Sequence, residues 1–143
     1  MNGSKTFIFF IFSLIALEAC GPGSTEEICD TVQCEQQLLY DQVIELHDEV
    51  MPKLSQISTL KSEIEVKMEA SGDSIERSEW LQLMLQLDEA DESMWVWMRQ
   101  FKPDMDSTVT VEDMAYLETQ LKEVAEVAQN INGSIERSKK ALE

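Results

Sequence analysis

LMLQLDEADESMWVWMRQF, residues 83–101, decides the fold that we expect for this chain. Its apolar residues recur at steps of four, three, four, three and four positions: Leu83, Leu87, Ala90, Met94, Trp97 and Phe101. This rhythm keeps one face of an α-helix apolar along its whole length. We therefore predict a helix over 74–101 that begins after the capping residue Asp73, ends before Pro103 and packs lengthwise against other helices.

Two more long helices are predicted on either side of this stretch. The first covers about 31–69, carries two adjoining apolar stripes and is expected to kink at Pro52, which lacks a backbone donor. The last begins at Thr110, which forms a capping box with Asp113. Short loops make neighbouring helices antiparallel, so the predicted fold is all-α: an up-down-up bundle of three long helices with coiled-coil-like packing over 30–143. The alternative is a longer coiled coil completed by a second chain.

The chain begins with a pattern typical of export. Residues 7–17 form an eleven-residue apolar run, which is too short to span a membrane and suits a signal peptide. Leu17, Ala19 and Cys20 fit a bacterial lipoprotein signal, whereas Glu18 does not. We predict a signal peptide over 1–19, lipid on Cys20 and a flexible tether over 20–29. Secretion without lipid is the alternative.

The charge balance limits the class of partner. The chain has 28 acidic and 11 basic residues and a net charge of −17. Removing 1–19 leaves the net charge unchanged, since this segment holds one lysine and one glutamate. So acidic a chain repels nucleic acid and suits solvent, cations or a basic partner. The sequence contains no catalytic serine–histidine–acid pattern and no phosphate-binding loop, so we predict that the protein is not an enzyme.

Cys29 and Cys34 form the one cysteine pair that we predict to be a disulfide. If Asp30 caps the first helix, the two cysteines occupy the positions that meet in a hydrophobic staple, and export permits oxidation. Two reduced thiols are the alternative. The spacing is not the CxxC of a redox enzyme or of haem attachment.

Three segments resemble a known family: LHDEVMPKL (46–54), MWVWMRQF (94–101) and MAYLETQ (114–120). They are similar to small envelope lipoproteins of Bacteroidota that carry the label "viral A-type inclusion protein". The resemblance covers most of the mature chain. It implies a location in the cell envelope of a Gram-negative bacterium and supplies no catalytic residue. Together with the lipid predicted on Cys20, it leads us to expect that the protein is anchored in the outer membrane and faces the periplasm.

Three Asp–Ser/Thr steps resemble the protein O-glycosylation signal of Bacteroidota envelope proteins, and they make Thr31, Ser74 and Ser107 candidate acceptors. Helix capping, which gathers aspartate and hydroxyl residues at helix starts, is the alternative explanation.

Soft ligands are predicted to converge near one end of the bundle. Antiparallel pairing about a turn near residue 72 places the single histidine opposite a tryptophan, and pairing about a turn near 106 adds a methionine of the last helix. Imidazole and thioether donors select Cu(I), and a b-type haem is a further possibility. Plain core packing is the alternative. The candidate residues are His47, Met51, Met94, Met98, Met114 and Trp97.

From these observations we expect a lipid-tethered acidic bundle with a structural or protein-interaction role, bound to the membrane through Cys20 and to another envelope protein. Copper binding is the alternative function.

Overall fold

The computed structural model describes residues 31–106 and 108–143, which form helices and no strand. Their elements are α1 (Val32–Val50), the 3₁₀ turn η1 (Met51–Lys53), α2 (Leu54–Ala70), α3 (Ser74–Gln100) and α4 (Val111–Leu142). The all-α prediction is confirmed.

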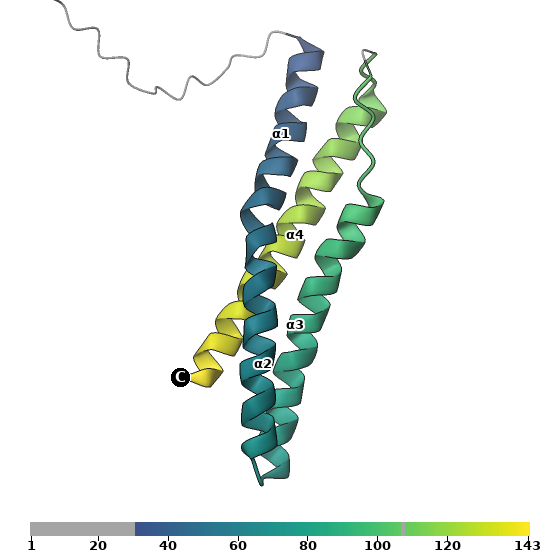
Figure 1. Cartoon of the computed structure of the whole chain (residues 1–143). Coiled ribbons are helices and arrows are strands. Elements are labelled where there is room, and N and C mark those ends of the chain that lie inside the picture. Colours follow the sequence, from purple (N-terminus) through teal and green to yellow (C-terminus); the bar gives the residue numbers. More distant parts are fainter. Residues whose placement is uncertain (1–30, 107) are drawn as a thin grey trace, which may run out of the picture.

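The helices pack as three rods (Figure 1). In the first rod, α1, η1 and α2 follow one another to the far end of the molecule, where a short turn leads into α3. α3 runs back, the described residues 101–106 and 108–110 form no helix, and α4 then runs in the same direction as α1. α4 packs against α1 and α3, and α2 packs against α3. This is the predicted up-down-up bundle.

Pro52 interrupts the first rod where the sequence places a kink. Because proline has no backbone N–H, it cannot bond the carbonyl one turn earlier. The chain tightens there into η1, and the hydroxyl of Ser55 donates to the carbonyl of Pro52 at 2.7 Å.

Side-chain caps begin two of the helices as predicted. The hydroxyl of Thr110 accepts from the amide of Asp113 at 3.2 Å, and the carboxylate of Asp113 accepts from the amide of Thr110 at 2.8 Å. Hydrogen bonds from the Thr110 side chain and backbone hold the pKa of Asp113 below its ordinary value. Asp73 caps α3 by accepting from the amide of Ile75 at 2.7 Å.

The start of α1 corrects the prediction. The capping residue is Thr31, not Asp30: its backbone is extended, and its hydroxyl accepts from the amide of Cys34 at 3.2 Å. Cys34 is therefore the third residue of the helix rather than the fourth. Cys34 therefore does not occupy the hydrophobic-staple position from which we predicted its pairing with Cys29.

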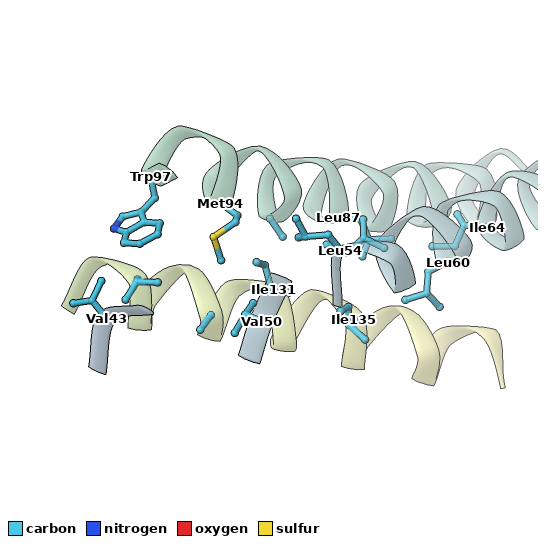
Figure 2. Packing of buried hydrophobic residues seen from close by; sticks show 14 residues of the cluster. Val43, Val50, Leu54, Leu60, Ile64, Leu87, Met94, Trp97, Ile131 and Ile135 are labelled. Carbon is cyan, nitrogen blue, oxygen red and sulfur yellow. The ribbon is translucent and has the colours of Figure 1, made fainter. Parts of the chain in front are cut away.

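The core lies along the axis between the rods (Figure 2). Leu87, Ala90, Met94 and Trp97 of the predicted rhythm are buried, while Leu83 and Phe101 are half-buried at its edge. The first rod and α4 supply the other buried apolar residues: Val43, Val50, Leu54, Ile57, Leu60, Ile64, Leu117, Val124, Ala128, Ile131 and Ile135.

Three polar contacts between rods show how far α4 reaches along the other two. Lys53 donates to the side-chain oxygen of Asn132 at 2.9 Å, and Lys139 donates to that of Gln56 at 2.9 Å. On the other side, Arg137 donates to Gln86 at 2.8 Å. α4 therefore ends beside the middle of α2, and the tip of the α2–α3 hairpin projects beyond it (Figure 1).

Candidate functional site

His47 and Met98 form the closest pair of the predicted soft cluster. The Nε2 atom of His47 in α1 lies 3.3 Å from the Sδ atom of Met98 in α3. The His47 ring also faces Trp97, with ring centroids 5.7 Å apart and planes inclined by 35°. The side chain of His47 is 21% exposed, so the pair lies under the surface of the bundle with access to solvent.

Asp48 fixes the proton on the His47 ring. Its Oδ1 atom lies 2.8 Å from Nδ1 of His47. Because a carboxylate only accepts hydrogen bonds, Nδ1 must carry a proton in this contact. In the neutral ring, Nε2 then presents its lone pair to the sulfur of Met98.

An aromatic row lies beside the cluster. Phe101 stacks on Trp97 at 4.9 Å, and it lies 6.2 Å from Tyr40 and 6.4 Å from Tyr116. The hydroxyl of Tyr116 accepts from the amide of Lys102 at 2.7 Å. These contacts join α1, α3 and α4 at the point where α3 ends, and they hold Trp97 in place.

Two other predicted sulfur residues belong to the core around this pair. Met94 is fully buried, and Figure 2 shows it and Trp97 reaching from α3 toward the other rods. Met51 is half-buried against the same core, and its amide donates to the carbonyl of His47, one helical turn earlier.

Met114 does not join the cluster. Tyr40 and Tyr116 both contact Phe101, so they are level along the bundle. His47 lies two helical turns beyond that level, and Met114 lies about half a turn before it. His47 and Met114 are therefore separated by more than about 10 Å along the bundle axis. The prediction assumed a tight turn near 106, but the described residues 101–106 and 108–110 form no helix, and the Asp104 carbonyl accepts from Gln36 of α1 at 2.9 Å.

The donors of this site are soft ones. Within 31–106 and 108–143, no three side chains of His, Cys, Asp and Glu come together in a way that could hold a metal ion. An ion at His47 would therefore depend on sulfur.

A second feature is an acidic groove between α3 and α4, with a volume of about 650 Å³. Its floor includes Val96, Trp97 and Val127, and the indole N–H of Trp97 has no acceptor among the described residues. Five carboxylates line it: Asp88, Glu89, Glu92, Glu123 and Glu126. Nothing in the sequence indicates this groove, since acidic residues are dense along the whole chain.

Internal partners neutralise only part of the groove. Lys61 of α2 pairs with Asp88, and Arg99 pairs with Glu92 at 2.7 Å. The amide of Gln120 donates to Glu123 at 2.8 Å. Glu89 and Glu126 are exposed and make none of these contacts.

The modification sites lie near helix starts or outside the described residues. Cys34 is disulfide-bonded, and no second cysteine occurs within the described residues. Cys20, Cys29 and Ser107 lie outside them. Of the candidate sugar acceptors, Thr31 uses its hydroxyl as a cap, whereas Ser74 is exposed in the first turn of α3.

No helix of the described segments is both long enough and apolar enough to span a membrane. In comparisons by family model, by sequence with curated proteins and by structure with solved proteins, nothing matches this chain.

Proposed function

We propose that this protein is a lipid-anchored, non-catalytic adaptor of the bacterial cell envelope, which binds a partner protein through the acidic groove between α3 and α4. The groove carries the proposal because it combines an apolar floor with carboxylates along both walls. The anchor is the lipid predicted on Cys20, and the expected location is the outer membrane, with the bundle in the periplasm.

The partner that fits this groove is a basic amphipathic helix. Val96 and Val127, which are half-buried above the buried Trp97 ring, offer an apolar surface to its non-polar face, in the way that a helix lies in a hydrophobic groove. Glu89 and Glu126 are available to lysine or arginine side chains flanking that face. Opposite charges of this kind speed association and select the partner more than they add affinity.

Charge alone does not explain the choice of surface, because the whole chain is acidic. The groove sets five carboxylates around an apolar floor, so it offers a partner both charged and apolar contacts. Binding through it should weaken with salt, since surface charges are screened beyond about 8 Å at physiological ionic strength.

Site-specific photocrosslinking in native membranes tests the proposal. A photoreactive amino acid in place of Gln100, which lines the groove, is expected to capture a protein with a basic amphipathic helix. The same amino acid in place of Gln37, exposed on α1, should not capture it.

A matched pair of charge reversals separates the groove from the overall charge. Glu89→Lys with Glu126→Lys should abolish the crosslink. Glu45→Lys with Glu65→Lys changes the net charge equally on exposed positions of α1 and α2 and should preserve it. A crosslink that forms equally from position 37, or that survives the first pair of reversals, contradicts the proposal.

A further inference from the structure

We propose that His47 and Met98 are ligands of a site for a soft monovalent cation, Cu(I) or its analogue Ag(I), with Met51 as the third donor and the face of Trp97 as one wall. The inference does not rest on a protein partner in the acidic groove, although Trp97 belongs to both sites.

The first argument is the pairing of lone pairs. With Nδ1 of His47 donating to Asp48 at 2.8 Å, the neutral ring turns a bare Nε2 toward the thioether of Met98 at 3.3 Å. Nε2 is therefore the nitrogen left to bind an ion in the neutral ring, and the sulfur of Met98 is a second donor beside it. Imidazole and thioether donors are those that Cu(I) selects.

The second argument is distance. Typical bonds from a metal ion of this size are about 2.0 Å to an imidazole nitrogen and about 2.3 Å to sulfur. With these lengths, atoms 3.3 Å apart subtend an angle of roughly 100° at the ion. That angle suits a three- or four-coordinate site, so the separation of the two donor atoms is compatible with both binding one ion.

The third argument is the surrounding structure. A ligating histidine usually donates its other ring N–H to a carboxylate, which orients the ring, and Asp48 occupies that position. Trp97 lies 5.7 Å from the His47 ring, and an aromatic face near a cation stabilises it. The aromatic row around Phe101 holds this wall in place.

Met51 is the sulfur best placed to complete the site. It follows His47 by one turn, so the two residues share a face, and it is half-buried. Met94 also lies one turn from a ligand, but it is fully buried in the core. Met114 lies too far along the bundle.

Silver titration of the mature protein, with free thiols blocked by alkylation, tests the site without a reductant that would open the disulfide. Isothermal titration is expected to find one Ag(I) per chain. In the ¹⁵N spectrum of the imidazole, Nε2 should shift strongly on binding and Nδ1 should shift little.

Single variants identify the ligands. His47→Gln, Met98→Leu and Met51→Leu should each weaken Ag(I) binding at least about tenfold, the lower end of what loss of even an outer-shell partner costs. Met114→Leu and Met94→Leu are the matched controls and should bind like the parent. Met→Leu nearly conserves volume, and helicity by circular dichroism checks that each variant folds.

Three outcomes overturn the inference. The first is that His47→Gln or Met98→Leu binds Ag(I) as tightly as the parent. The second is that Met114→Leu loses as much Ag(I) affinity as the ligand variants, which would mean nonspecific binding to methionine. The third is that the ¹⁵N signal of Nδ1 shifts on binding instead of that of Nε2. Loss of protein crosslinking in the groove variants has no bearing on this result.

Discussion

Leu87→Ala perturbs α3 at a fully buried position. Leu87 is 0% exposed within the core cluster. The substitution removes three carbon groups, each worth about 0.8 kcal/mol of burial. The cavity left behind adds to this, because neighbouring rods relax only in part. We expect the free energy of unfolding to fall by about 3–4 kcal/mol.

Leu85→Ala is the matched control in the same helix. It deletes the same atoms and changes helix propensity by the same amount, but Leu85 is 54% exposed. About half of the transfer free energy is at stake and no enclosed cavity forms, so the expected loss is about 1 kcal/mol. The two variants should differ by about 2–3 kcal/mol.

Urea unfolding followed by circular dichroism measures both variants. With a slope of about 1–3 kcal/mol per molar urea, the Leu87→Ala midpoint should lie about 1–2 M below that of Leu85→Ala. Equal midpoints would mean that the face of α3 carrying Leu87 does not point into the core. The apolar periodicity of residues 83–101 would then not determine how α3 packs.

Further predictions concern charge and covalent chemistry. The pKa of Asp113 is lowered in the folded protein, so its capping contacts stabilise the fold above pH 3.8, and this contribution is lost as the pH falls through the folded pKa. The carboxyl ¹³C shift of Asp113 should therefore titrate below pH 3.8. Asp113→Asn should remove this part of the acid dependence of stability. Mature protein should carry acyl mass on Cys20, and Cys20→Ala should release a soluble or uncleaved form; an unmodified amino terminus elsewhere refutes the anchor. With the Cys20 sulfur acylated, peptide mapping should find Cys29 joined to Cys34, and free thiols at both positions in oxidised periplasmic material would contradict the pairing. Any sugar should appear at Thr31, Ser74 or Ser107, and a native intact mass equal to the bare lipoprotein rules it out.

The sequence was most informative where local chemistry acts alone. The rhythm of α3, the Thr110 cap and the break at Pro52 each depend on residues within one or two turns. They could be predicted because helix periodicity, capping and the missing donor of proline are local properties.

Features that depend on distant residues could not be predicted. The side chain of Gln36 donates a hydrogen bond to the carbonyl of Asp104, 68 positions further along the chain. No local pattern in the sequence around Asp104 predicts this contact. With this connection, Met114 lies near the level of Tyr40 rather than that of His47, so His47 meets Met98 while Met114 stays outside the cluster. The acidic groove has the same origin, since it depends on which faces of α3 and α4 meet.

The overhang of the α2–α3 hairpin makes the length of the molecule adjustable. From Val32 to Ala70 the first rod extends about 58 Å at 1.5 Å per residue, and α4 stops well before its tip. A heptad inserted into α2 with another into α3, both beyond the end of α4, would lengthen the rod by about 10 Å without touching the groove or His47. The distance from an anchored end to the α2–α3 turn could therefore be changed, by evolution or by design, without altering what the rest of the bundle binds.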